Sequence, residues 1–186
     1  MKNIEVEVRS LITKGEYKRL LEKLDKEAKF VDLIKEETVY LSFNNKKDLR
    51  LRRSEKETFL ILKKGKIHDS FRQEFKIRFA REDFGKLEEL LKALDYKAKV
   101  RWFRKRRVYL WNKIKVFLDD TKGYGFIIEL EKIGKIGEAK KIYKNLKNKL
   151  KSLGIKITPK KVFNEKFEYY KNNWQKILNY ENRKNN

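Results

Sequence analysis

The chain has 186 residues, a formal net charge of +23 and no cysteine. Apolar residues make up 40% of it and aromatic residues 13%, which supports a hydrophobic core and excludes disorder throughout. Disulfide stapling is excluded, and no run of 18 or more apolar residues or leader-like segment occurs, so we expect a cytoplasmic protein without a membrane span. The large excess of Lys and Arg predicts a partner that carries phosphate groups.

The first predicted elements are a strand and a helix. Apolar and charged residues alternate strictly over residues 4–9, which is the period of a strand. Thr13 and Glu16 have the spacing of a capping box, so we predict a helix that begins after Thr13 and ends near residue 28.

The rest of the chain contains mainly short alternating runs. Strands are predicted at residues 37–43, 48–53, 58–64, 71–79, 98–111, 113–119 and 126–132, and helices at 81–94, 137–153 and 164–178. Gly and Pro are rare before a polar segment at the end, which predicts one domain over residues 1–178 and a flexible tail over residues 179–186. About eight strands and four helices indicate an α+β fold with mainly antiparallel pairing.

The polar faces of the predicted strands carry long ionic side chains. Glu5 and Glu7 project from one face of the first strand, and Arg50 and Arg52 repeat this geometry on another strand. If the strands close into a barrel with the helices outside, these charges line its interior, which is costly unless a ligand balances them. A polyanion bound with a divalent cation suits both signs of charge, because Arg grips phosphoryl oxygens and carboxylates hold Mg²⁺ or Mn²⁺.

Six segments resemble, in chain order, the landmarks of the CYTH superfamily, also called the triphosphate tunnel metalloenzymes. They are EVEVR at residues 5–9, LRLR at 49–52, LILKKG at 60–65, RQE at 72–74, RKRRVY at 104–109, and the block formed by FLD, GYG and ELE at 117–119, 123–125 and 129–131. The chain departs from the family pattern at Arg9, where Lys is usual, and at Phe126, where Asp is usual. The resemblance covers roughly residues 1–170.

The resemblance implies an eight-stranded antiparallel β-barrel tunnel with a charged lumen, flanked by outer helices. It also implies a triphosphate substrate and Mg²⁺ or Mn²⁺ as cofactor. Carried over to this chain, the metal ligands are Glu5, Glu7, Glu74, Asp119, Glu129 and Glu131. The triphosphate ligands are Arg9, Arg50, Arg52, Lys63, Arg72, Lys76, Arg104, Arg106 and Lys161. The residues expected to take part in catalysis are Glu5, Glu7, Arg52 and Arg106.

Three functions are compatible with these residues. The favoured one is metal-dependent hydrolysis of tripolyphosphate or a nucleoside triphosphate, with thiamine triphosphate as a further candidate substrate. The second is a class IV-type adenylyl cyclase, which makes cyclic AMP and pyrophosphate from ATP. The third is a non-catalytic RNA-binding module that uses the basic segment 104–107 and its aromatic neighbours, although six carboxylates would repel a nucleic-acid backbone. A homodimer is a family-level expectation.

Overall fold

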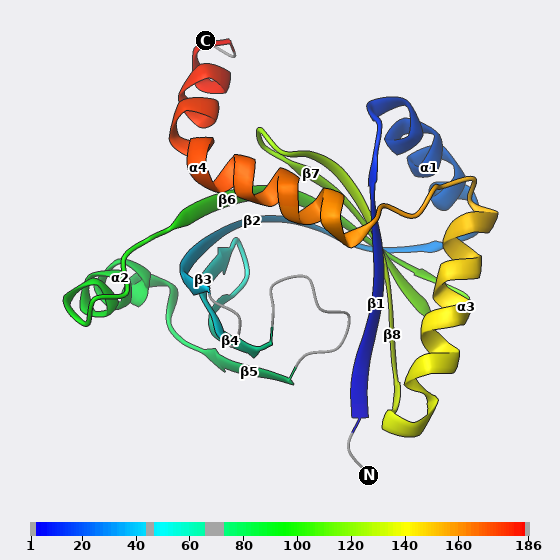
Figure 1. Ribbon diagram of the computed structural model, residues 1–186, viewed down its shortest axis with the longest axis horizontal. Helices are drawn as coiled ribbons and strands as arrows, with labels where there is room; N and C mark the ends of the chain where they lie inside the picture. The colour runs from blue at the N-terminus through cyan, green and yellow to red at the C-terminus, as the bar shows by residue number, and fades with distance from the viewer. Residues whose placement is uncertain (1–2, 44–46, 66–72, 185–186) are drawn as a thin grey trace.

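The computed structural model describes residues 3–43, 47–65 and 73–184. Its strands form one eight-stranded antiparallel sheet in the order β1-β8-β7-β6-β2-β3-β4-β5 (Figure 1). The predicted α+β fold with an eight-stranded antiparallel sheet and outer helices is therefore confirmed. The strands are β1 (Asn3–Ile12), β2 (Lys29–Phe43), β3 (Lys47–Ser54), β4 (Thr58–Lys64), β5 (Gln73–Arg78), β6 (Val100–Trp111), β7 (Ile114–Thr121) and β8 (Gly125–Lys135). The helices are α1 (Lys14–Glu27), α2 (Phe84–Ala93), α3 (Ala139–Ser152) and α4 (Lys160–Lys184), with short 3-10 turns at Arg81–Asp83 and Ile136–Glu138.

The sheet curls so that one face becomes concave and the other convex. Figure 1 shows β1 and β5 as the two edges of this curl, with α1 and α3 outside it and α4 running across it. Along β1, Val6 and Val8 are buried toward the convex side, whereas Glu5 and Glu7 lie on the opposite side. The alternation in the sequence thus separates an apolar outer face from an ionic inner face.

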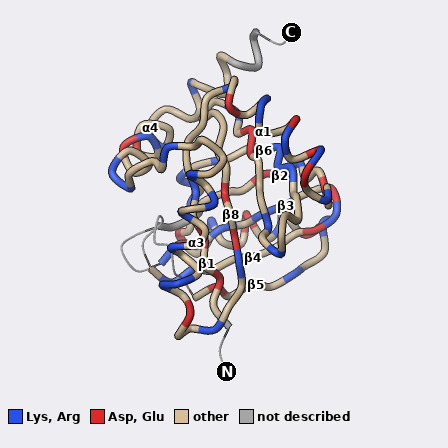
Figure 2. The backbone as a smooth tube through the Cα atoms, turned by 90° about the vertical axis from the view of Figure 1, so that its right-hand side faces the viewer, with Lys and Arg blue, Asp and Glu red and all other residues tan. Residues whose placement is uncertain are grey.

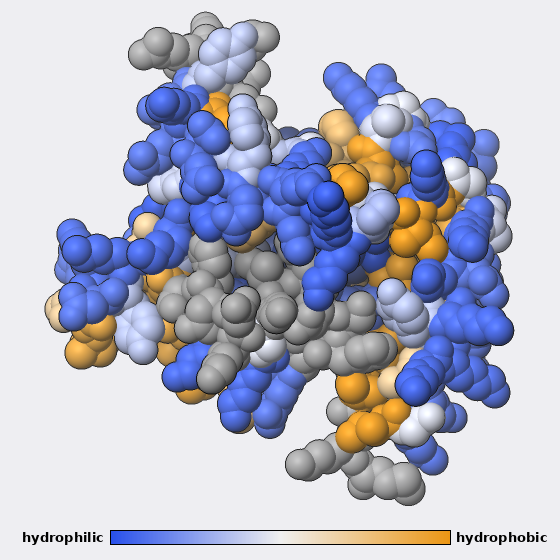
Figure 3. Space-filling model, viewed as in Figure 1, coloured by the Kyte–Doolittle hydropathy of each residue, from blue (hydrophilic) through white to orange (hydrophobic). Residues whose placement is uncertain are grey.

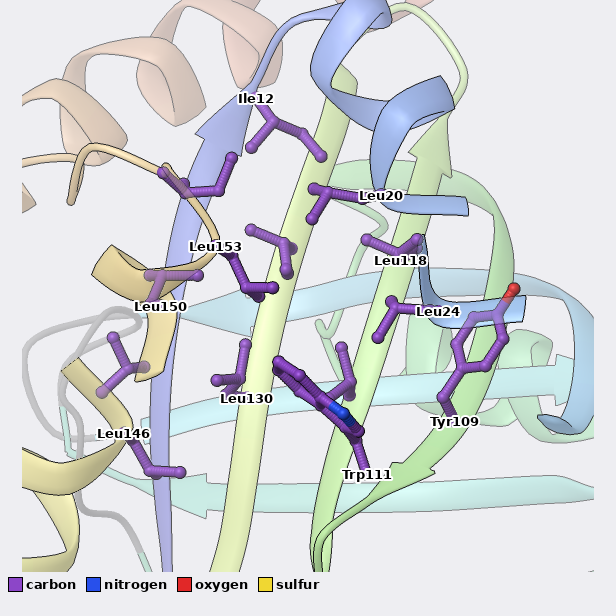
Figure 4. Packing of buried hydrophobic residues seen from close by; sticks show 14 of the residues in the cluster. Ile12, Leu20, Leu24, Tyr109, Trp111, Leu118, Leu130, Leu146, Leu150 and Leu153 are labelled. Atoms are coloured by element: carbon purple, nitrogen blue, oxygen red, sulfur yellow. The ribbon is translucent and has the colours of Figure 1, made fainter. Parts of the chain in front are cut away.

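The largest hydrophobic core lies between the convex face and the helices α1 and α3. Leu20 and Leu24 of α1 pack beside Leu118 of β7 (Figure 4). Leu146 and Leu150 approach from α3 in the same core. The capping box predicted at Thr13 is present and fixes the start of α1. This core holds four neighbouring strands rigid and so fixes the position of the charges on their inner face.

The strand β2 and the helix α4 extend furthest beyond their predicted bounds. The strand β2 begins at Lys29, eight residues before the predicted start, because residues 29–36 pair with the distant strand β6. The helix α4 begins at Lys160, directly after Pro159, and continues to Lys184, so residues 179–184 are helical. Among the described residues, no helix is both long and apolar enough to cross a membrane. The face shown in Figure 3 is largely hydrophilic, with smaller apolar areas between.

The turn between β7 and β8 depends on glycine. Gly123 has a φ of +69°, which glycine adopts without strain, and a Cβ atom placed there would lie 2.2 Å from Cγ2 of Ile177 on α4. Phe167 and Tyr170 of α4 also pack against Trp102 on the sheet. The close approach at Gly123 therefore allows α4 to lie against the concave side.

Candidate functional site

The concave face of the sheet encloses a charged cavity of about 270 Å³, to which all eight strands contribute side chains. Thirteen of the residues predicted from the sequence line it. They are Glu5, Glu7, Arg9, Arg50, Arg52, Lys63, Glu74, Lys76, Arg104, Arg106, Asp119, Glu129 and Glu131. Residues from distant parts of the sequence thus meet in one site.

Two of the predicted triphosphate ligands are not among these residues. Arg72 lies outside the residues that the structure describes. Lys161 is on α4, but its side chain is 86% exposed and its Nζ lies 3.8 Å from Oε1 of Glu165. The structure therefore does not bring Lys161 to the cavity. Helix α4 contributes Phe163 and Phe167 to the lining instead, and the guanidinium of Arg9 lies 5.2 Å from the centre of the Phe163 ring.

Four arginines form one side of the cavity, which we call the arginine wall: Arg50, Arg52, Arg104 and Arg106. They occupy alternate positions on β3 and β6, so all four point inward. Arg106 donates two hydrogen bonds to Asp119, from Nε to Oδ1 at 2.7 Å and from Nη2 to Oδ2 at 2.8 Å. Arg104 donates from Nη1 to the same Asp119 at 2.9 Å. Asp119 therefore orients two arginines, a role that the sequence analysis did not assign to it.

Two further carboxylates in the arginine wall were missed by the sequence analysis. Glu36 accepts a hydrogen bond from Nε of Arg104 at 2.9 Å, and Arg104 with its arginine neighbours holds the pKa of Glu36 well below its usual range despite burial. Asp48 is fully buried and accepts from Nε of Arg50 at 2.8 Å. Asp48 lies two residues before Arg50 on the same strand, and this spacing was a signal that could have placed it on the inner face.

Arg52 is less well neutralised than its neighbours. Its Nε is buried and has no hydrogen-bond partner within the described parts of the chain. The nearest carboxylate oxygen in an ion pair with it is Oε1 of Glu36, 3.9 Å from Nε. Burial, together with repulsion from Arg104 and Arg50, lowers the pKa of Arg52. The cavity therefore presents a buried guanidinium that an anion would stabilise.

Four glutamates on β1 and β8 form the opposing side, which we call the carboxylate wall: Glu5, Glu7, Glu129 and Glu131. Burial raises the pKa of Glu131 to about 7, with a further contribution from the negative charges of Glu5 and Glu129. The pKa of Glu5 is raised in the same way, mainly by burial and partly by Glu7, against the opposing effect of Lys63. Negative charge is therefore in excess around Glu5 and Glu131.

This carboxylate wall has the donor chemistry that suits Mg²⁺ or Mn²⁺, which prefer carboxylate oxygens. The raised pKa values of Glu5 and Glu131 show that a nearby cation would relieve their repulsion. No group of three or more Asp or Glu side chains is already arranged to hold a metal ion within the described residues. The donor chemistry of the wall thus fits such a cation, while the described residues hold no preformed cluster for it.

A second, wider cleft of about 1270 Å³ adjoins the cavity and shares Arg104 and Tyr124 with it. It lies between α4, the turn that follows β7 and the neighbouring ends of β2 and β3. Tyr169 and Tyr180 of α4 and Phe103 of β6 contribute aromatic surface to its lining. The cavity and the cleft therefore meet at these two shared residues.

Comparisons with known proteins identify the family. A putative adenylate cyclase of Methanocaldococcus jannaschii is 31% identical over 108 residues, which are 58% of this chain and 62% of that protein. A conserved hypothetical protein of Pyrococcus furiosus has a similar structure, with a TM-score of 0.65 and 27% identity over 82% of this chain and 91% of that one. A protein of Pyrococcus horikoshii gives a TM-score of 0.66 and 26% identity, over 84% and 95%. Residues 3–160 match the model of the CYTH domain, and the chain therefore belongs to the CYTH domain family.

Proposed function

We propose that the protein is a Mg²⁺- or Mn²⁺-dependent enzyme that hydrolyses tripolyphosphate or a nucleoside triphosphate with release of phosphate. The observation that carries this proposal is the pairing, in one small cavity, of the under-neutralised Arg52 with the unbalanced carboxylates Glu5 and Glu131. A chain of phosphates with a bound cation supplies negative charge to Arg52 and positive charge to the two carboxylates. Neither wall alone would favour such a ligand over a simple ion.

The arginine wall would bind and orient the phosphates. Arg106 is held by the two hydrogen bonds that it donates to Asp119. Arg50 is held by the hydrogen bond that it donates to Asp48 and by stacking at 4.4 Å on the Tyr40 ring. Guanidinium groups that are fixed before the substrate binds need not be ordered at that moment, so more of the interaction energy stabilises the transition state. Arg52 has an unused donor, which would point at a phosphoryl oxygen.

The carboxylate wall would act at the attacking water. In hydrolysis, a water oxygen forms a bond to the terminal phosphorus while the bond from that phosphorus to the bridging oxygen breaks. The proton released by the water passes to a carboxylate of this wall. The charge that develops on the leaving phosphate oxygen is stabilised by the arginines. A bound divalent cation would supply further charge neutralisation at the phosphoryl oxygens.

The second candidate is cyclisation of ATP, in which the ribose 3′-hydroxyl attacks the α-phosphorus and pyrophosphate leaves. The cleft beside the cavity favours it, because at about 1270 Å³ the cleft has more room for a nucleoside than the cavity of about 270 Å³. A nucleoside would therefore have to lie in the wider cleft. The relative from Methanocaldococcus jannaschii is named a putative adenylate cyclase, which gives this candidate further support.

The test is a product assay with tripolyphosphate, ATP and thiamine triphosphate, each with Mg²⁺, with Mn²⁺ and with a chelator. We expect orthophosphate from tripolyphosphate or a nucleoside triphosphate in the presence of metal and none with the chelator. Cyclic AMP with pyrophosphate would instead establish the cyclase. If no substrate gives a product with either metal, the enzyme proposal is wrong and the RNA-binding module becomes the better explanation.

A further inference from the structure

The helix α3 differs from the other helices in its charge. It contains six lysines and neither Asp nor Glu, whereas α1, of equal length, contains five basic and four acidic residues. The two helices pack on the same hydrophobic core. The outer face of each therefore needs polar residues for one reason alone, which is that it contacts water. A mixed set of charges satisfies that need in α1. The uniform charge of α3 is not explained by solvation alone.

Four of these lysines lie in one row on the helix surface. Ile142, Leu146 and Leu150 are buried against the sheet, and the row lies on the opposite side, at intervals of four, three and four residues. We call this row the lysine stripe: Lys140, Lys144, Lys147 and Lys151. At a rise of 1.5 Å per residue its ends are about 16 Å apart along the helix axis. Asn148, four residues after Lys144 and three before Lys151, lies beside it and offers a further hydrogen-bond donor.

The stripe has no counter-charge of its own. None of its four lysines lies within 4.0 Å of a carboxylate in the part of the chain that the structure describes. Like charges four residues apart on a helix repel each other and reduce its stability. Helix α3 lies outside the curl on its β1 and β8 side, as Figure 1 shows, and Figure 2 views the molecule from that side with Lys and Arg in blue. The stripe is therefore separate from the tunnel cavity.

We propose that the lysine stripe binds the phosphate backbone of a nucleic-acid duplex. A straight, rigid row of cations matches a regular row of phosphates on one strand, and such contacts do not depend on base sequence. The one aromatic ring of α3, Tyr143, is half-buried and has Nζ of Lys147 at 5.4 Å from its centre, so the exposed side of the helix carries mostly Lys and Asn and little of the stacking surface that binds single strands. Its apolar residues are buried in the core, so it also lacks the apolar face with which a helix enters a membrane surface.

The test measures binding of the full chain to a 20-base-pair duplex, of DNA and of RNA, by fluorescence anisotropy at several salt concentrations. In the variant, the four stripe lysines are changed to Gln, which retains helix propensity. A matched control changes Lys86, Lys92, Lys97 and Lys99 to Gln, which removes the same charge around α2 at the other end of the molecule (Figure 1). We expect the stripe variant to bind at least 10-fold more weakly at low salt and the control to change less than threefold. The slope of log affinity against log salt should become less steep by about 3 for the stripe variant.

Three outcomes would overturn the proposal: equal losses in the two variants, unchanged binding by the stripe variant, or stripe-dependent binding to anionic lipid vesicles but not to a duplex. Turnover of tripolyphosphate and the helical circular dichroism signal report whether each variant folds. If the quadruple variant is unfolded, the pair Lys144→Gln and Lys147→Gln is used, and it should still lower the slope by about 2. Equal affinity of the protein for the DNA duplex and the RNA duplex indicates backbone contacts, in agreement with the proposal.

Discussion

The two walls of the cavity are built from similar numbers of charged residues, but they are neutralised to different degrees. In the arginine wall, Arg50 and Arg106 each donate to a neighbouring carboxylate, whereas Arg52 has a buried Nε without a hydrogen-bond partner among the described residues. In the carboxylate wall, Glu129 is stabilised by Arg106, whereas Glu5 and Glu131 repel each other. The cationic side is thus largely assembled before a ligand binds, while the anionic side is completed by what binds there.

This difference assigns different tasks to the two walls. A side chain whose position is fixed by its neighbours can select the shape of a ligand, because it does not move to accommodate others. A cluster with uncompensated charge instead gains stability from any suitable cation, and the identity of that cation is set by ligand type and geometry. The predictions that follow separate these tasks.

The largest effect is expected from removing one charge of the carboxylate wall. Glu7→Gln keeps the size of the side chain, so the fold should survive, but metal-dependent turnover should fall by about 10³-fold because a ligand to the cation is lost. Steady-state phosphate release at several Mg²⁺ concentrations measures this. Glu22→Gln, at an exposed position on α1, is the matched control. Turnover by Glu7→Gln equal to that of the control would exclude Glu7 from the site.

A somewhat smaller loss, of about 10²-fold in kcat/KM, is expected from Arg52→Ala in the arginine wall. Its buried Nε is the unused donor, so its loss should weaken both substrate binding and transition-state stabilisation. The neighbouring Arg53→Ala serves as control, because Arg53 points to the other face of β3 and pairs there with Glu37 at 2.6 Å. Similar losses in the two variants on tripolyphosphate would show that strand stability, not phosphate binding, explains the effect.

The local sequence predicts which residues belong to the two walls better than it predicts how far their charges are neutralised by partners. Alternation on each strand identified which residues share a face, because side chains alternate between faces, and the family pattern supplied the eight-stranded tunnel that brings those faces together. The sequence analysis did not predict Asp48 and Glu36, because their role depends on their partners. Glu36 comes within hydrogen-bond distance of Arg104 only because β2 pairs with β6. Lys161 was expected in the cavity but lies outside it, because α4 is rotated so that Lys161 faces outward. Packing of the buried Phe163 and Phe167 sets this rotation.

The overall fold could be predicted from the sequence because its main features depend on residues close together in the chain. The capping box of α1 and the strand β4 over Thr58–Lys64 agree with the predicted bounds. The first half of β2 was not predicted, since residues 29–36 become a strand only by pairing with β6. Charge balance is similarly a property of distances between strands, which no single segment encodes.

The role of Asp48 can be separated from that of the substrate ligands. Asp48→Asn removes the charge that holds Arg50, and this should lower the free energy of unfolding by about 2 kcal/mol because a buried charged hydrogen bond is lost. Chemical denaturation without ligand measures this cost. Added tripolyphosphate should restore more stability to Asp48→Asn than to the unaltered protein, because it supplies an anion to the released guanidinium. Equal stabilisation of the two proteins would show that Arg50 does not meet the phosphates.

The smallest effect concerns the pH dependence of stability, which reports on the carboxylate wall alone. In the folded chain the pKa of Glu131 is about 7, against 4.5 for an unperturbed Glu, so the native state holds more protons than the unfolded state between these values. Stability must therefore fall as pH rises from about 5 to about 8 in the absence of metal.

A divalent cation should cancel this loss, because it replaces the proton as the partner of Glu131. Excess Mg²⁺ is therefore expected to raise Tm at pH 8 by about 3 °C more than at pH 5.5, which corresponds to about 1 kcal/mol in a chain of this size. Differential scanning fluorimetry of the unaltered protein and of Glu131→Gln measures it. The variant keeps a neutral side chain at all pH values, so it should lose most of the pH dependence and of the added stabilisation by Mg²⁺. If Mg²⁺ shifts Tm equally at both pH values, the cation binds elsewhere, and the contrast between a completed arginine wall and an incomplete carboxylate wall does not hold.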